Sequence, residues 1–114
     1  MKEEDTIKFK SEFVQDIIKK KKWATTRLDR KGMGRRRIIS VEKDGSKTPM
    51  NVYVDIYAIL SWKKIHPNKL HYAVVEGENC VDTEAFDLLL REIYGEKIVN
   101  KTKHTHFFDV IVGE

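Results

Sequence analysis

The sequence predicts an α+β fold in which a mostly antiparallel sheet closes into a β-barrel flanked by two helices. Three observations lead to this prediction. The chain has 114 residues, which suits a single domain spanning residues 1–114. Hydrophobic residues make up 40% of it, enough for one modest core. Segments of strand and helix periodicity follow one another in the order β-α-β-β-β-α-β, which separates the strands from the helices.

The first predicted elements are a short strand and a helix. Residues 7–9 continue an alternation of apolar and polar side chains, which is typical of a strand. Ser11 is expected to cap the helix, because its hydroxyl can accept a hydrogen bond from a free backbone N–H. The lysines at 19–22 suit the negative end of the helix dipole. The apolar face of this helix consists of Phe13, Val14, Ile17 and Ile18.

Three strands and a basic loop are predicted in the middle of the chain. They are, in order, a strand at 23–27, a glycine-containing loop at 30–37, a strand at 36–41 and a long strand at 50–62. Asp44 and Gly45 indicate a tight hairpin turn between the last two strands. Tyr53 and Tyr57 share one face of the long strand. We expect them to pack a helix against the sheet, with stacking on a ligand as the alternative.

The remainder of the chain is expected to hold a second helix and a last strand. A loop is predicted at 66–68, whereas the pattern at 70–75 is ambiguous, with a short strand as one interpretation. Asp82 or Thr83 is expected to cap the helix, and Gly95 to end it. A polar loop at 97–104 then leads to a strand at 107–112. The buried stripe of the second helix is predicted to consist of Phe86, Leu89, Leu90 and Ile93.

Positive charge is concentrated in one segment of the chain. The formal net charge is +4, yet residues 19–37 contain ten basic residues and a single acid, Asp29. This asymmetry predicts a polyanionic partner, with a solvated loop that has no partner as the alternative. The basic residues of the segment are Lys19, Lys20, Lys21, Lys22, Arg27, Arg30, Lys31, Arg35, Arg36 and Arg37.

Other features limit the kinds of site and location to be expected. The single cysteine, Cys80, excludes an internal disulfide and a thiolate metal cluster. No apolar run is long enough to span a membrane, and no secretory signal follows Met1, so we expect a cytoplasmic protein. A monomer is the default expectation for its assembly. His104 and His106 would share a strand face, but further ligands cannot be identified. Neither a metal nor another cofactor is therefore predicted.

The segment from Ile7 to Arg27 resembles the opening of the ASCH domain family, a branch of the PUA-like superfamily. There a strand and a helix lead into a Gly-x-Lys-x-x-x-x-Arg motif, onto which residues 20–27 can be aligned. Lys22 and Arg27 match the lysine and the arginine, and Lys20 replaces the glycine. The acidic loop at 76–79, the helix start at 83–86 and the end at 106–110 resemble later parts of the same family. The resemblance covers nearly the whole chain and implies a PUA-like barrel.

The resemblance also implies a function. Proteins of this family are generally taken to bind RNA in a cleft beside the barrel, and some small members remove the acetyl group from N(4)-acetylcytidine. The implied partner is thus RNA or a modified nucleoside. The catalytic lysine, threonine and glutamate would correspond to Lys22, Thr25 and Glu78, with Glu76 as the alternative carboxylate. The residues expected to bind RNA are Lys20, Lys21, Lys22, Trp23, Arg27, Arg30, Arg35, Arg36 and Arg37.

Strand alternation sets a condition on this site. On a regular strand, Lys22 and Thr25 would point to opposite faces. Both can reach one ligand only if Lys22 lies in the turn between helix and strand, where alternation has not begun. Arg27 could then bind a phosphate or a base edge through paired donors. Trp23 could stack on a base, with packing in the core as the alternative.

Overall fold

The computed structural model describes residues 5–63 and 69–113. Five strands form one sheet in the order β1-β3-β4-β5-β2. The β1 and β3 strands are parallel and the other three pairs are antiparallel, so the predicted α+β fold with a mostly antiparallel sheet is confirmed. The strands are β1 (Thr6–Lys10), β2 (Ala24–Arg27), β3 (Gly34–Val41), β4 (Lys47–Trp62) and β5 (Lys103–Val112).

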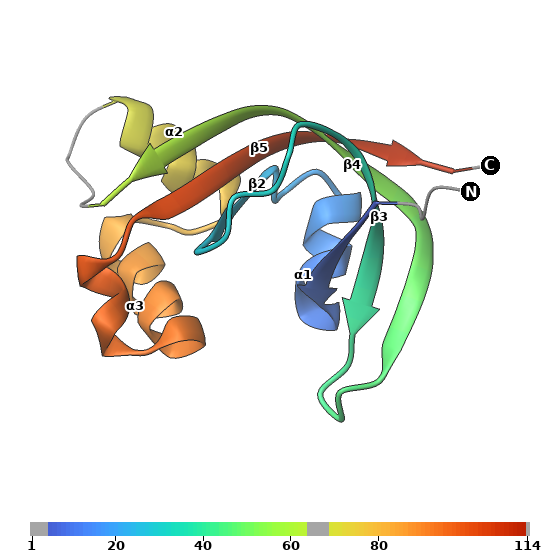
Figure 1. Cartoon of the computed structure of the whole chain (residues 1–114), viewed down its shortest axis with the longest axis horizontal. Coiled ribbons are helices and arrows are strands. Elements are labelled where there is room, and N and C mark those ends of the chain that lie inside the picture. The colour runs from blue at the N-terminus through green and yellow to red at the C-terminus, as the bar shows by residue number, and fades with distance from the viewer. Residues whose placement is uncertain (1–4, 64–68, 114) are drawn as a thin grey trace.

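The sheet curls into a half-barrel and does not close (Figure 1). Its edge strands, β1 and β2, form no ladder with each other, so the barrel predicted from the sequence is open on one side. The long β4 strand carries a bulge between Ile56 and Ala58 where it pairs with β5. A bulge bends the strand and increases its local twist, which helps the sheet to curl.

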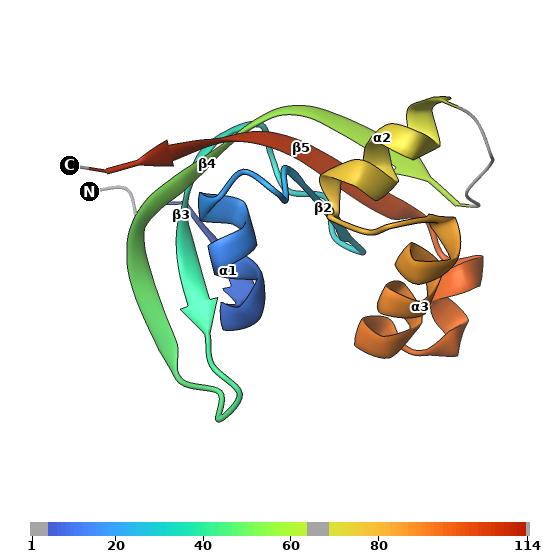
Figure 2. The same cartoon turned by 180° about the vertical axis from the view of Figure 1, so that it is seen from behind.

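Three α-helices and one 3-10 helix pack against the sheet. Figures 1 and 2 show α1 inside the curve of the sheet, with α3 at the opposite end and β2 between them. The α2 helix lies over the ends of β4 and β5 that are nearest α3. The helices are α1 (Ser11–Ile18), α2 (Lys69–Gly77), α3 (Thr83–Tyr94) and the 3-10 helix η1 (Glu96–Asn100). No helix in the described ranges has both the length and the apolar character needed to cross a bilayer.

Two hydrophobic clusters form the core. The first lies between α1 and the sheet, and the second lies beneath α2, α3 and η1. The first consists of Ile7, Phe9, Val14, Ile17, Ile38, Val52, Val54, Ile56 and Phe108. The second consists of Val74, Val75, Phe86, Leu90 and Ile98.

The element boundaries depart from prediction in the first half of the chain. Ser11 is already the first helical residue, and Lys10 occupies the cap position without a side-chain hydrogen bond. Ser11 is therefore not the cap. The β3 strand begins at Gly34, so residues 35–37 belong to the sheet and not to the predicted loop. Tyr57 is exposed, and Tyr53 packs beneath arginine guanidinium groups, so the expected packing of a helix on these tyrosines is wrong.

The second half contains a further correction. The sequence pattern at 70–75 is ambiguous, and the strand interpretation is wrong, since α2 occupies this segment. Val74 and Val75 have a modest preference for strands, but their burial against the second cluster outweighs it. Asp82 caps α3 by accepting a hydrogen bond from the Ala85 N–H, as one of the two predicted caps. The 3-10 helix replaces part of the loop predicted at 97–104, and β5 begins at Lys103. The loop predicted at 66–68 lies outside the described residues.

Candidate functional site

The turn that follows α1 places Lys22 ahead of β2. The Lys20 N–H donates to the Ile17 carbonyl at 3.0 Å, and the Lys21 N–H donates to the Asp16 carbonyl at 2.8 Å. This pair of bonds is a Schellman motif, which needs a left-handed residue at the first position after the helix C-cap. Lys20 supplies that conformation with φ of 62°, at the position where the ASCH motif has glycine. Lys22 thus lies in the turn, and the condition derived from strand alternation is met.

The end of α2 repeats the same motif. The Asn79 N–H donates to the Glu76 carbonyl and the Cys80 N–H to the Val75 carbonyl, at 2.9 and 3.0 Å. Asn79, with φ of 59°, is the left-handed residue. Apart from glycines, Lys20 and Asn79 are the residues with positive φ in the described ranges. Left-handed backbone therefore lies two residues before Lys22 and directly after Glu78.

Close contact between α2 and the start of β2 brings these two turns together. The Trp23 N–H donates to the Gly77 carbonyl at 2.8 Å. A Cβ atom on Gly77 would lie 2.7 Å from the Ala24 Cβ, a distance that atoms in contact do not adopt. Glycine is thus required for α2 to approach β2 this closely. The approach sets Glu78, the next residue, opposite Lys22.

Lys22 and Glu78 form a buried ion pair. The Lys22 Nζ lies 2.7 Å from the Glu78 Oε2, and the two side chains are only 4% and 5% exposed. The ammonium also lies 5.3 Å from the centre of the Phe13 ring. Removing two charges from water costs several kcal/mol per ion, which their mutual attraction offsets only in part. Such a pair is weak support for stability and a reason to look for a function.

A small pocket adjoins this ion pair. Its volume is about 120 Å³, and it lies where β1, β2 and α3 meet. Lys22, Thr25, Arg27 and Glu78 all line it, so the residues implied by the family motif converge on one pocket. Glu78 is the carboxylate that reaches it, whereas Glu76, the alternative, is exposed and does not line it.

Two polar atoms at the pocket residues have no partner in the described part of the chain. They are the Glu78 Oε1 and the Arg27 Nε, both buried. Arg27 spans the gap between the edge strands, since its terminal nitrogen donates to the Lys8 carbonyl and its guanidinium lies 4.9 Å from the Phe9 ring centre. Burial lowers the pKa of Arg27, and Tyr94, Asp29 and Glu78 oppose that shift. Buried polar atoms are nearly always hydrogen-bonded, so these two are candidates for contacts with a ligand.

Sequence reasoning missed Tyr94 as a pocket residue. Its hydroxyl lies 3.4 Å from the Thr26 carbonyl, and burial raises the pKa of Tyr94 above its ordinary value. Tyr94 follows Phe86 and Leu90 at intervals of four on α3. This helical spacing was the signal that could have identified it. The pocket lining also includes Phe13, Leu89 and Ile93, which make its wall partly apolar.

The other residues expected to bind RNA do not line this pocket. Lys20, Lys21, Arg30 and Arg35 are exposed. Trp23 lines a separate surface pocket with Lys20. Arg36 donates to the Gly32 carbonyl. Arg37 donates to the Met50 carbonyl and to the Tyr53 hydroxyl.

The histidines and the cysteine have local partners. His106 is fully buried, and its Nε2 lies 2.9 Å from the Lys31 N–H, which must donate to it. Its Nδ1 then carries the proton and donates to the Thr25 carbonyl at 3.2 Å. Burial lowers the pKa of His106 and raises that of the Cys80 thiol. Within residues 5–63 and 69–113, no group of three or more metal-ligating side chains is brought together.

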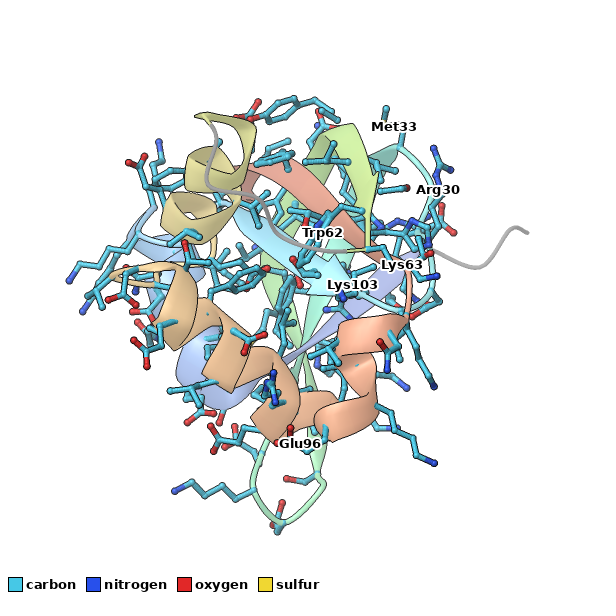
Figure 3. All side chains as sticks on the ribbon, turned by 90° about the vertical axis from the view of Figure 1, so that its left-hand side faces the viewer. Arg30, Met33, Trp62, Lys63, Glu96 and Lys103 are labelled. Carbon is cyan, nitrogen blue, oxygen red and sulfur yellow. The ribbon has the colours of Figure 1, made fainter. Side chains whose placement is uncertain are left out.

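A larger cavity lies elsewhere. It measures about 430 Å³ and is walled by Trp62 and Lys103, with Lys63 at the same side of the molecule (Figure 3). The Lys103 ammonium donates to the carbonyls of Lys63 and Ile98 at 2.8 and 2.9 Å and lies 4.8 Å from the Trp62 ring centre. These contacts give Lys103 a structural role in holding η1 to β4. We therefore place the candidate site at the smaller pocket.

Comparison with known proteins supports the fold. No protein-family model matches the sequence, and no curated protein matches it significantly. Among solved structures, the chain is similar to protein EF3133 from Enterococcus faecalis V583, of the family DUF984, with a TM-score of 0.64 and 12% identity. That match covers 98% of this chain and 83% of the other.

Two variants of the ZmASCH protein from Zymomonas mobilis are also similar in structure. Their TM-scores are 0.56 and 0.57, with identities of 15% and 14%. The matches cover 94% and 91% of this chain, and 69% and 66% of the ZmASCH chains. Because the identities are low, these likenesses concern the fold. The chain has the ASCH-like fold.

Proposed function

We propose that the chain binds RNA or a nucleoside, and that one ring of the ligand enters the pocket at the Lys22–Glu78 ion pair. The observation that carries the proposal is the convergence of this pair with Thr25 and Arg27, although Lys22 and Glu78 are 56 positions apart in the chain. Burying an ion pair beside a pocket costs desolvation free energy, which a residue pair that serves only solubility would not incur. The basic residues outside the pocket would attract the phosphate backbone.

The chemistry of the pocket suits the edge of a nucleobase. The unpartnered Glu78 Oε1 can accept a hydrogen bond from a ring or exocyclic N–H, and the hydroxyl of Thr25, which also lines the pocket, can donate to a carbonyl oxygen or ring nitrogen. Small-molecule sites usually measure roughly 300–1,000 Å³. The pocket of about 120 Å³ is smaller than this range, so we expect it to take one base and to leave the sugar and phosphate at its mouth.

Binding to a fluorescent oligoribonucleotide tests this proposal. The Arg27→Gln variant removes the orphan donor and should weaken binding by roughly tenfold, since hydrogen bonds to charged groups have that magnitude. The control is Lys101→Gln, which removes the same charge from an exposed residue that does not line the pocket. Thermal melting would show that both variants fold. Equal affinity of wild type, variant and control, or no binding by the wild type, would contradict the proposal.

Amide hydrolysis is the second candidate function, favoured by the presence of Lys22, Thr25 and Glu78 in one pocket. In this scheme a proton moves from the Lys22 Nζ to the Glu78 Oε2 along their 2.7 Å contact, leaving an amine and a carboxylic acid. The amine then takes the proton of the Thr25 hydroxyl as its oxygen attacks the acyl carbon. The carboxylic acid protonates the leaving amine. Water releases the acyl group from Thr25 as a carboxylic acid and regenerates the hydroxyl.

Hydrolysis of N(4)-acetylcytidine tests this candidate. The expected products are cytidine and acetate, resolved by chromatography. Thr25→Ala should abolish turnover, Thr25→Ser should retain part of it, and Thr102→Ala, at an exposed site outside the pocket, should leave it unchanged. Lack of turnover by the wild type at high enzyme concentration would leave the binding function alone.

We also propose that the protein acts as a cytoplasmic monomer. The sequence features behind the cytoplasmic location are the single cysteine and the absence of a long apolar run, and the monomer is the simplest assembly of one domain. Size-exclusion chromatography with light scattering, and fractionation of cells that express the full protein, test it. A stable dimer or recovery in a secreted fraction would contradict it.

A further inference from the structure

We infer that the β1 side of the pocket mouth binds a phosphate group, so that the ligand is a nucleotide, free or within RNA, and not an unphosphorylated nucleoside. This inference rests on the proposed function and specifies its ligand class. The residues assigned to the phosphate are Arg27, Lys8 and Lys47. Lys8 and Lys47 were not among the residues predicted from the sequence to bind RNA.

The charge of the pocket is the first observation. Four cationic residues, Lys8, Lys10, Lys22 and Arg27, line it, with a single carboxylate, Glu78. Glu78 is already engaged by Lys22 at 2.7 Å. The remaining three cations therefore leave the pocket and its mouth with an excess of positive charge that an anionic ligand would neutralise.

The position of Arg27 is the second observation. Its terminal nitrogen is held by the Lys8 carbonyl, which fixes the guanidinium between the edge strands β2 and β1. Its Nε is buried and has no partner in the described part of the chain. A guanidinium that is held at one nitrogen and unpartnered at another is preorganised to donate to an oxyanion.

Crowding of cations beside this arginine is the third observation. Lys10 pairs with Val41 on β3, and Val41 pairs with Lys47 on β4, so strand register places Lys47 in the same cross-strand row as Lys10, on the side of the sheet edge that carries Lys8. The charge of Lys47 accordingly lowers the pKa of Lys8. Lys31 is paired with Asp29 at 2.9 Å, whereas no ion pair involves Lys8 or Lys47 in the described residues. The like charges of Lys8 and Lys47 repel each other in the free protein. A phosphate between them would relieve that repulsion and accept hydrogen bonds from both.

The geometry of a nucleotide matches this arrangement. A base in the pocket of about 120 Å³ leaves its sugar at the mouth, where β1 forms the rim. A phosphate attached to that sugar would reach Lys8 on the exposed surface of β1, and Lys47 lies on β4, one strand beyond β3. A bare nucleoside would leave these cations without a partner.

Calorimetric titration of the wild-type protein with matched ligands tests the inference. The four nucleosides are compared with their 5′-monophosphates, and with dinucleoside phosphates in which the phosphate is a diester. The best monophosphate or diester should bind roughly tenfold more tightly than its nucleoside. Tighter binding of the monophosphate identifies a free nucleotide, and tighter binding of the diester identifies an RNA chain; either supports the inference.

Variants locate the phosphate. The double substitution Lys8→Ala with Lys47→Ala should remove most of the preference for the phosphorylated ligand over its nucleoside. The control, Lys97→Ala with Lys101→Ala, removes the same charge from exposed residues that do not line the pocket, and should keep the preference. All four substituted lysines are exposed, so both variants should fold.

The outcomes separate this inference from the function on which it rests. Equal affinity of the wild type for nucleosides and nucleotides would overturn the phosphate assignment and leave the binding function standing. Absence of binding to every ligand would overturn both. Equal loss of the preference in the double variant and in the control would show a general effect of charge, and would overturn the assignment to Lys8 and Lys47.

Discussion

Replacing Lys20 by glycine should stabilise the protein, because the turn before Lys22 uses a backbone conformation that glycine adopts without strain. Lys20 has φ of 62° and is the left-handed residue of the Schellman motif. The left-handed conformation costs a side-chain-bearing residue about 1–2 kcal/mol. Glycine in turn loses roughly 0.5–1 kcal/mol more backbone entropy on folding. The net gain expected for Lys20→Gly is about 0.5–1 kcal/mol in the free energy of unfolding.

Urea unfolding and thermal melting measure this gain. For a chain of this size the melting temperature should rise by about 2–5 °C. Two controls remove the same charge: Lys20→Ala keeps the strained conformation, and Lys21→Gly places glycine at a neighbour that lacks positive φ. Lys20→Ala should change stability little, and Lys21→Gly should lower it by about 0.5 kcal/mol. If Lys20→Gly were no more stable than Lys21→Gly, the assignment of the turn would be refuted.

Three further predictions concern the same region. Gly77→Ala should destabilise the protein by about 1–3 kcal/mol in urea unfolding, because the added methyl group meets the Cβ of Ala24 on β2. Gly32→Ala meets only the flexible end of the Arg36 side chain and should cost less. Equal losses in the two variants would contradict the close approach of α2 to β2. Lys22→Ala should destabilise the protein by about 3–5 kcal/mol, since it leaves the buried Glu78 carboxylate unpaired. Lys22→Met combined with Glu78→Gln should restore most of that loss. A double variant as unstable as Lys22→Ala would argue against a buried ion pair. Burial lowers the pKa of His106 in the folded protein, so the unfolded chain binds the proton more readily. The contribution of His106 to stability should be present above pH 6.5, the ordinary histidine value, and should be lost as pH falls from there through the folded pKa. In urea unfolding, His106→Gln should lose less stability over this pH range, and an unchanged pH dependence would contradict the role of His106.

Most of the sheet and the α1 and α3 helices could be predicted from periodicity, because their buried residues repeat at two or at three to four positions. The α2 helix could not. Its valines favour a strand, and the contact that decides otherwise, burial of Val74 and Val75 against Phe86, joins distant parts of the chain. The 3-10 helix was missed for a related reason, since it depends on the carbonyl contact with Lys103 and on burial of Ile98.

The residues of the site were predicted from the resemblance of their motifs, and their convergence was not visible in local sequence. The contact of Gly77 with Ala24, which joins the two halves, has no local signal beyond a glycine at a helix end. Tyr94 could have been found from its spacing on α3. Lys8 and Lys47 could not, because adjacent cations on β1 and β4 are brought together only by the pairing of both strands with β3.

The most direct test of the central claim, that the pocket at Lys22 and Glu78 is the ligand site, is a two-dimensional amide NMR titration with the tightest-binding nucleotide. Chemical-shift changes should concentrate at β1, β2 and the α2–α3 junction, including the amides of Thr25 and Glu78, and should saturate with a single affinity. Changes confined to the cavity walled by Trp62 and Lys103, or an unchanged spectrum at millimolar ligand, would contradict the claim.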